Sequence, residues 1–375
     1  MTTTDTPDVR WSEEGGLAIV KNAGSGHFSA VDLTQQEVVA DIGDGKYPHT
    51  VVFHPDGRHA LLLYISSAHL EVVDLERMET VVREENLGTA SIGCALSEDG
   101  ERLFVTTGAT LPDADEPGVI AFSLTGDPPT PERLGTRVLS RCTGTTIGPN
   151  GRLYVGEKRR GQVAVLSADG DLELLDRIDV GDEPHDMYPV PDTEMLVVNN
   201  AGESYASFID VEERTVTNAE TGENPHGLAF AADPSGGRRV YFPAREDDRV
   251  AAVDLDAVVA GDPTTEFVDV GTSTGFVATT PDDRYALFDS YETEHVTIVD
   301  AETFSVQSRV RVGGEPLHLV VSPDDKECYV GNMDQDHRHL TVLDIEPLQD
   351  DRPEDVTVSG RIEGLGKLPS GIFTR

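Results

Sequence analysis

The chain repeats a short β-rich unit about every 45 residues. Each unit contains an apolar strand that closes on aspartate or serine, and these closing positions recur along the whole sequence: Asp32, Asp74, Ser123, Ser167, Asp210, Asp254, Asp300 and Asp344. Short alternating strands with a period of forty-odd residues are typical of propeller blades, which bury their faces against neighbouring blades. The repeat therefore predicts an all-β propeller.

The order of motifs inside a unit predicts four strands. A unit opens with glycine and a polar turn, as in GDEPHD at 181–186 and GGEPLH at 313–318, and runs into an apolar strand. A tight turn such as HPDG at 54–57 follows, because proline, aspartate and glycine supply the backbone angles that a hairpin needs. A second strand, a third strand with the closing aspartate and a more polar fourth strand complete one blade.

Counting the units predicts eight blades. Seven full units begin near Gly43, Gly88, Gly135, Gly181, Gly222, Gly271 and Gly313. Residues 15–43 supply three further strands, and the C-terminal LPSGIFTR resembles their missing first strand. We therefore predict a single domain over 1–375, closed by both termini through a split blade from 9–43 plus 364–375, which leaves no free edge. Seven blades remain the alternative if VRWSEEGG is a strand of its own and the C-terminal segment is a tail.

The composition is strongly acidic. The chain has 69 acidic and 29 basic residues, only five of them lysine, and a net charge of −40. Dispersed acid with scarce lysine resembles the surface of a halophilic protein, whose self-repulsion is screened by salt. Nothing here would neutralise a run of phosphates, so nucleic acid is excluded as a partner.

The N-terminus lacks signal-peptide features and no segment is apolar enough to span a bilayer, which predicts a soluble, cytoplasmic protein that does not bind membranes.

Two recurrent features receive structural interpretations. The strand-ending aspartates are expected to accept hydrogen bonds from backbone N–H groups of the following turn. Cys94, Cys142 and Cys328 lack metal or haem-attachment spacing and are expected to be buried thiols. The sequence also lacks the phosphate-loop, nucleophile-elbow and zinc-helix motifs.

Two units, GEPLHLVVSPDDKECYVGN and GENPHGLAFAADPSGGRRVYF, carry a resemblance to the YVTN family of β-propeller repeat proteins. The resemblance covers nearly the whole chain and implies the propeller fold. Proteins of this general type include surface-layer proteins, lactonase-like enzymes and the haem-binding propeller of dissimilatory nitrite reductase. Many of the surface proteins are exported, whereas this N-terminus lacks an export signal.

The turns that lead into the first strands are the candidate functional site. In an up-and-down blade these turns share one face with the loops between second and third strands, so they should meet at one mouth of a central channel. We predict a ligand site there, formed by His49, His185, His226, His318, Asp186, Lys158, Arg159 and Arg245. His49, His185 and His226 are the predicted metal ligands, because neutral imidazole is a frequent ligand. The structural alternative is that histidine in this turn bonds the backbone of the neighbouring blade.

The residues that begin the third strands form a second alignment, also rich in histidine: His27, His69, Gly118, Gln162, Tyr205, Arg249, His295 and His339. Third strands lie roughly 10 Å outside the first strands, so these side chains are too dispersed to share one metal. Loop or inter-blade contacts are favoured for them, with a partner surface as the alternative.

Three functional hypotheses follow from these patterns. The first is a propeller that binds a small molecule, metal or cofactor at the His-lined mouth, with a divalent metal favoured over haem. The second is a lactonase-like or lyase-like enzyme in which one of these histidines acts as acid or base beside a metal. The third is a scaffold whose loop-rich face docks another protein.

Overall fold

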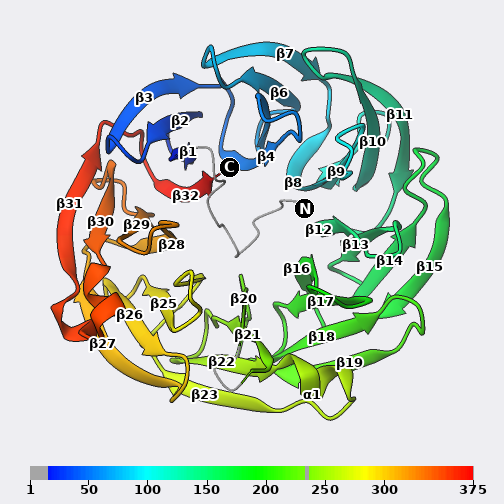
Figure 1. Cartoon of the computed structure of the whole chain (residues 1–375). Coiled ribbons are helices and arrows are strands. Elements are labelled where there is room, and N and C mark those ends of the chain that lie inside the picture. The colour runs from blue at the N-terminus through cyan, green and yellow to red at the C-terminus, as the bar shows by residue number, and fades with distance from the viewer. Residues whose placement is uncertain (1–15, 233–235, 375) are drawn as a thin grey trace. The chain divides into compact units, whose positions relative to one another are not determined.

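The fold is built almost entirely from antiparallel strands. The computed structural model describes residues 16–232 and 236–374, and Figure 1 labels the elements. The strands form eight four-stranded sheets. Two compact units divide the described residues, one of residues 41–216 and the other of residues 16–40, 217–232 and 236–374. The boundaries fall within the third strand and just after the start of the nineteenth.

The first unit contains the sheets β4-β5-β6-β7, β8-β9-β10-β11, β12-β13-β14-β15 and β16-β17-β18-β19. Their strands are β4 (Pro48–Phe53), β5 (His59–Tyr64), β6 (His69–Asp74), β7 (Glu79–Glu85), β8 (Thr89–Leu96), β9 (Arg102–Thr110), β10 (Gly118–Thr125), β11 (Thr130–Val138), β12 (Cys142–Ile147), β13 (Leu153–Glu157), β14 (Gln162–Leu166), β15 (Leu174–Asp179), β16 (Pro184–Pro189), β17 (Met195–Asn200), β18 (Tyr205–Asp210) and β19 (Val216–Glu220).

The second unit contains the sheets β20-β21-β22-β23, β24-β25-β26-β27, β28-β29-β30-β31 and β3-β2-β1-β32. Their strands are β20 (Ala229–Ala232), β21 (Arg238–Phe242), β22 (Arg249–Asp254), β23 (Thr265–Asp269), β24 (Val277–Thr279), β25 (Tyr285–Ser290), β26 (His295–Asp300), β27 (Ser305–Arg311), β28 (Pro316–Val321), β29 (Glu327–Asn332), β30 (His339–Asp344), β31 (Thr357–Glu363), β1 (Leu17–Asn22), β2 (His27–Asp32), β3 (Glu37–Ile42) and β32 (Pro369–Thr374).

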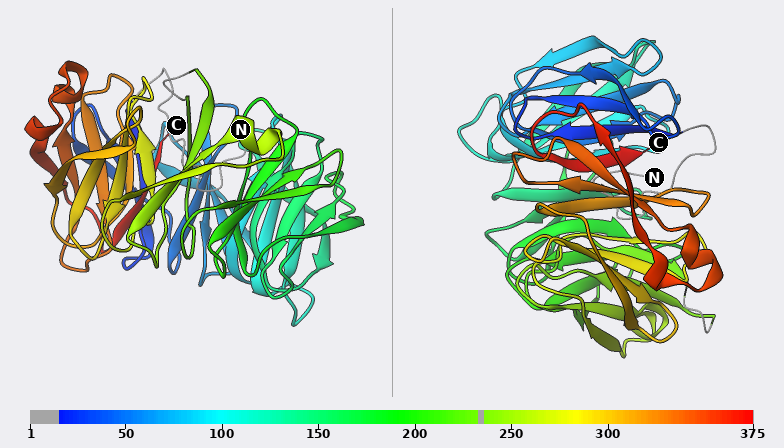
Figure 2. Two further views of the ribbon diagram at one scale, coloured as in Figure 1. Left: turned by 90° about the horizontal axis from the view of Figure 1, so that it is seen from below. Right: turned by 90° about the vertical axis from the view of Figure 1, so that its left-hand side faces the viewer.

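Three short helices interrupt the connections between third and fourth strands. They are α1 (Leu255–Val259), η1 (Glu346–Asp350) and η2 (Pro353–Asp355). Asp254 caps α1, because its carboxylate accepts hydrogen bonds from the N–H groups of Asp256 and Ala257. The two 3-10 helices are the orange-red coils between β30 and β31 in Figure 2.

These eight sheets make the chain an eight-bladed β-propeller, which confirms the predicted fold class. The split blade is present: β32 pairs antiparallel with β1, with Val20 opposite Ile372. Residues 9–15, on which the seven-blade alternative depended, lie outside the described residues. That residues 1–375 form one domain stays a prediction.

The hydrophobic core of each unit lies between neighbouring blades. In the first unit, Leu61 and Val72 of one blade pack with Leu103 and Ile120 of the next. In the second unit, the apolar side chains of the β24–β27 and β28–β31 blades form one continuous cluster. Apolar strands therefore stabilise the fold by covering the faces of adjacent sheets.

The structure confirms the strand-ending aspartates as turn acceptors. Asp32 accepts a hydrogen bond from the Gln35 N–H at 2.9 Å, and Asp210 accepts from Glu212 and Glu213 at 2.9 and 2.8 Å. The side chains of Asp74, Asp254, Asp300 and Asp344 make the same type of bond.

The three cysteines are buried free thiols, as predicted. In the described part of the chain, no helix has the length and hydropathy that a membrane crossing needs.

The asparagine that ends several second strands holds the glycine turn in front of its blade. Asn332 accepts from the Glu315 N–H at 3.1 Å and donates to the Gly313 carbonyl at 3.1 Å. A Cβ on Gly314 would lie 2.5 Å from the Asn332 amide, so the contact requires glycine. Asn200 likewise accepts from the Gly181 N–H at 3.1 Å. Asparagine therefore fixes the turns that precede His185 and His318.

Candidate functional site

In the first unit, His185 is the second residue of β16, directly after one of these fixed turns. Its Nδ1 lies 2.9 Å from Asp186 Oδ1, and 36% of its side chain is exposed. Glu183, before the proline, has φ 53°, which is uncommon for a residue other than glycine. The Thr143 hydroxyl donates to the Pro184 carbonyl at 2.6 Å from the neighbouring blade. The turn is thus held from several sides while the imidazole stays accessible.

The Asp186 carboxylate sets the chemistry of this imidazole. A carboxylate oxygen at Nδ1 favours the tautomer with its proton there, which places the lone pair on Nε2. His49 has a similar arrangement, because its Nδ1 lies 2.8 Å from Thr50 Oγ1. In both turns the side chain that follows histidine orients the ring, which is how metal-ligating histidines are usually held.

The cationic loop after β13 lies beside the His185 turn. Lys158 Nζ is 2.8 Å from Glu183 Oε2, while the side chain of Arg160 turns back to Glu157 at 3.3 Å. Arg159 is exposed. The structure therefore brings together His185, Asp186 and Lys158, three of the predicted site residues in this unit. It places His49 at the second position of β4, in another blade of the unit.

In the second unit, a row of aromatic rings crosses four blades. The His226 ring lies 5.4 Å from Phe276, the Phe276 ring 4.6 Å from His318, and the His318 ring 6.1 Å from Phe373. His318 is only 4% exposed and its Nδ1 accepts the Ile372 N–H at 3.3 Å. This contact is the inter-blade role that the sequence left open for histidine in these turns.

A buried carboxylate, Asp289, joins two blades behind this row. Its side chain accepts the N–H groups of Gly275, Phe276 and His318 at 2.7, 2.9 and 3.0 Å. Burial raises the pKa of Asp289 to about 6, although the three backbone donors and the positive charge of Arg245 favour the ionised form. Arg245 thus has an electrostatic role toward Asp289, which the sequence did not reveal.

Sequence reasoning missed Asp289 and Phe276. Asp289 stands in LFDS, whereas the second strands LYVGE and ECYVGN have glycine before their last position. An acidic residue inside a strand that is otherwise apolar is a signal that could have identified it, because buried carboxylates require partners.

The raised pKa of Asp289 predicts that the stability of the folded protein depends on pH. Its folded-state pKa of about 6 lies above the ordinary value of 3.8, so the folded protein binds the proton more tightly than the unfolded chain. The contribution of this group to stability should therefore be largest below about pH 4 and should fall by up to about 3 kcal/mol as pH rises through 6. Denaturant unfolding of Asp289→Asn and the unmodified protein at pH 4 and 7 measures this. The advantage of the unmodified protein should shrink with rising pH; an advantage that grows would contradict it.

Comparisons with known proteins find two curated proteins that are similar to this chain over nearly its whole length. No family model matches it. Protein NirF of Pseudomonas aeruginosa is 25% identical over 396 residues, covering 98% of this chain and 92% of NirF. Protein NirF of Stutzerimonas stutzeri is 25% identical over 382 residues, covering 96% of this chain and 91% of that protein. The chain is thus similar to NirF proteins from end to end.

Solved structures agree on the fold. The dihydro-heme d1 dehydrogenase NirN, in complex with DHE, superimposes with a TM-score of 0.75 at 18% identity, covering 99% of this chain and 79% of NirN. The periplasmic gluconolactonase PpgL of Pseudomonas aeruginosa gives a TM-score of 0.61 at 14% identity, covering 95% of this chain and 98% of PpgL. At these identities the likeness shows the β-propeller alone.

Proposed function

We propose that this protein binds a planar, carboxylate-bearing tetrapyrrole of the haem d1 class. The observation that carries the proposal is the likeness to NirN, a dihydro-heme d1 dehydrogenase in complex with DHE, which extends over 99% of this chain. The alignment with NirF over 98% of the chain supports a shared organisation from end to end. The proposal thus specifies the predicted small-molecule ligand as a tetrapyrrole.

His185 fits the role of a ligand to the iron of such a macrocycle. Histidine is a common axial ligand of haem iron, and a carboxylate on its second nitrogen orients the ring. His185 combines these properties, because Asp186 lies 2.9 Å from Nδ1 and a third of the side chain is accessible. The iron-bearing ring would supply the redox chemistry, while the protein positions it.

Lys158 and Arg159 fit the carboxylate groups of the ligand. On a chain with a net charge of −40, an anionic ligand is repelled unless cations are concentrated where it binds. EKRRG is the compact cationic run of the sequence, and Lys158 is tied to the His185 turn through Glu183. A ligand carboxylate would replace Glu183 as the partner of Lys158. Arg245 remains a further predicted cation in the second unit.

The remaining functional predictions from the sequence stay predictions. That His49, His185 and His226 hold a divalent metal stays a prediction, as does a ligand role for His318, which would require exposure of its ring. A lactonase-like or lyase-like reaction and a protein partner are also predictions, together with a cytoplasmic location. Metal analysis and visible absorption of the purified protein separate metal, haem and ligand-free alternatives.

The proposal predicts a visible spectrum that depends on His185. Titrating the protein with DHE, and with iron protoporphyrin IX as a commercially accessible probe, should give a shifted Soret band at one equivalent. His185→Ala should abolish the axial-ligand signature, and the Lys158→Gln/Arg159→Gln double variant should weaken binding roughly tenfold or more, because it removes charge-assisted hydrogen bonds.

His295→Ala is the matched control for this titration, since His295 begins the third strand β26 of the second unit, whereas the cationic run belongs to the first unit. Its spectrum and affinity should equal those of the unmodified protein. Equal spectra for the unmodified protein and His185→Ala would remove His185 from the proposal. Absence of any spectral change with DHE would overturn the tetrapyrrole assignment.

A further inference from the structure

The turn between β4 and β5, in the first unit, carries a histidine whose two ring nitrogens both lie near oxygen atoms. His54 Nδ1 is 3.0 Å from Asp56 Oδ2, and its Nε2 is 3.2 Å from the carbonyl oxygen of Gly100 in the next blade. Only 13% of the His54 side chain is exposed. A carboxylate and a carbonyl only accept hydrogen bonds, so a ring that bonds both oxygens carries a proton on each nitrogen and a positive charge.

The next blade comes this close because residue 100 is glycine. Gly100 has φ 75°, and a Cβ at this position would lie 2.7 Å from His54 Nε2. The Gly100 N–H donates to the Ser97 carbonyl at 2.9 Å, which closes the turn 97–100 between β8 and β9. His54 therefore contacts the backbone of a tight turn that belongs to the neighbouring sheet.

The Asp56 carboxylate is held in its ionised form. Its Oδ1 accepts the N–H groups of Arg58 and His59 at 2.8 and 3.0 Å, and its Oδ2 lies 2.8 Å from His59 Nδ1. Burial alone would raise the pKa of Asp56, but the His59 hydrogen bond, the backbone N–H groups and the charge on His54 together lower it. His59 needs one proton, on Nδ1, for its bond, whereas His54 needs two.

The equivalent turns of three other blades have a hydroxyl group where this turn has His54. Each hydroxyl donates to the aspartate two residues later: Ser97 to Asp99 at 2.5 Å, Thr280 to Asp282 at 2.7 Å and Ser322 to Asp324 at 2.7 Å. His54 Nδ1 occupies the place of that donor. A hydroxyl group keeps its proton near neutral pH, whereas imidazole gains and loses one there.

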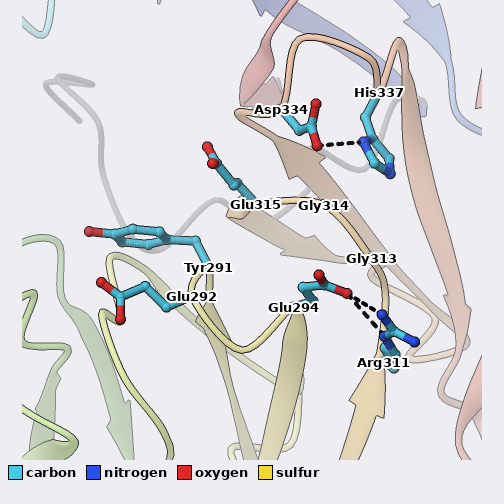
Figure 3. A pocket seen from close by; sticks show the side chains of 9 residues that line it. All are labelled: Tyr291, Glu292, Glu294, Arg311, Gly313, Gly314, Glu315, Asp334 and His337. Atoms are coloured by element: carbon cyan, nitrogen blue, oxygen red, sulfur yellow. Dashed lines mark hydrogen bonds and ion pairs between the residues drawn. The ribbon is translucent and has the colours of Figure 1, made fainter.

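His337, in the second unit, is a histidine–aspartate pair without a second acceptor (Figure 3). Its Nδ1 lies 3.3 Å from Asp334 Oδ2, but among the described residues this nitrogen makes no hydrogen bond. The ring lines an open polar pocket of about 870 Å³, and a quarter of the side chain is exposed. His54 differs because a backbone carbonyl of another blade lies at its second nitrogen.

We propose that His54 is a proton-dependent link between the β4–β7 and β8–β11 blades. In the charged form, Nδ1 donates to Asp56 and Nε2 donates to the Gly100 carbonyl. Loss of either proton places a lone pair against one of these oxygens, so one of the two bonds is lost. The neutral ring also has an alternative partner, because the Asp56 N–H lies 3.3 Å from Nδ1 and can donate to it. The link therefore forms at mildly acidic pH and opens at alkaline pH.

The other charged side chains around this link are already paired. Arg58 directs its guanidinium to the aspartate that ends β6, at 2.7 Å. In the turn of the next blade, the Asp99 carboxylate accepts from the Ser97 hydroxyl and from the Glu101 N–H. His59 shares the Asp56 carboxylate and is only 2% exposed. His54 is thus the group in this turn whose change of charge breaks a contact between blades.

Hydrogen exchange measured by mass spectrometry tests the link in the full chain, at about pH 5.5 and about pH 8. Rates are corrected for intrinsic exchange, and about 1 M KCl screens the exposed carboxylates. Protection of the amides at 97–101 should fall about fivefold or more at the higher pH, because the local opening is no longer opposed by the His54 bond. His54→Ser, which restores the hydroxyl of the other turns, should show no such pH dependence.

The turn 148–151 contains no histidine and is the internal reference, while His337→Ser removes a histidine–aspartate pair that has no second acceptor. Neither should alter the result at 97–101. In ¹⁵N-histidine NMR spectra, two ring N–H signals missing from His54→Ser should be present at about pH 5.5, and one should disappear by about pH 8. If His54→Ser does not fold, comparison of the two turns in the unmodified protein decides. Equal pH dependence at 97–101 and 148–151, or in the unmodified protein and His54→Ser, would overturn the proposal.

Discussion

A chain that ends at residue 367 should fail to form a stable second unit. It would lack β32, the first strand of the split blade, whose Ile372 is fully buried against Val20, Leu340 and Val342. Loss of the strand would expose the edge of β1, remove the Ile372 N–H from His318 and uncover the core beneath. Thermal melting by circular dichroism should show a lost or non-cooperative transition, accompanied by aggregation.

A point substitution tests the same contact without shortening the chain. Ile372→Asp would bury an unpaired charge and should cost about 4 kcal/mol or more. Lys367→Ala, at an exposed position just before the strand, is the control and should change stability by less than about 0.5 kcal/mol. A synthetic peptide with the sequence of residues 368–375 should partly restore the truncated chain, because it can re-form the strand pairing. Truncated protein that melts like the full chain would refute the closing role of β32.

The sequence predicted the strand framework well because the framework depends on local signals. The eight residues proposed to begin the third strands, from His27 to His339, are the first residues of those strands in the structure. Side-chain alternation and the glycine and proline turns set this register, and both are visible in a single repeat. The turn glycines also behave as expected; Gly57 has φ 74° and donates to the His54 carbonyl at 3.0 Å.

The site was harder to predict because it depends on side-chain orientations that the repeated motif does not encode. His185 and His318 follow similar glycine and proline turns, yet 36% of the His185 side chain is exposed and His318 is 4% exposed. His318 has φ 68°, and its one-residue displacement in GEPLH turns the ring between Phe276 and Phe373. Asp186 instead holds the His185 ring at its Nδ1. The neighbouring residue and the backbone angle, rather than the motif, decide the role of each histidine.

The acidic surface gives the other large expected effect, a dependence of stability on salt. Lowering KCl from about 1 M to about 0.1 M lengthens the Debye screening distance from roughly 3 to 10 Å. With 69 acidic against 29 basic residues, repulsion between surface carboxylates then rises throughout the folded protein and outweighs its surface ion pairs. The melting temperature should fall by on the order of 10 °C, which corresponds to several kcal/mol for a chain of this size.

The shape of the salt dependence identifies its cause. If screening dominates, most of the gain in melting temperature should occur below about 0.5 M, where the Debye length changes fastest, and NaCl should act like KCl. A rise that continues at higher concentration and is stronger with potassium sulfate would instead indicate exclusion of salt from the protein surface. Sucrose at matched osmolality separates these contributions, since it is excluded from the surface but does not screen charge. A melting temperature unchanged between about 0.1 and 1 M KCl would contradict the halophilic interpretation, because a net charge of −40 would then carry little repulsion in the folded state.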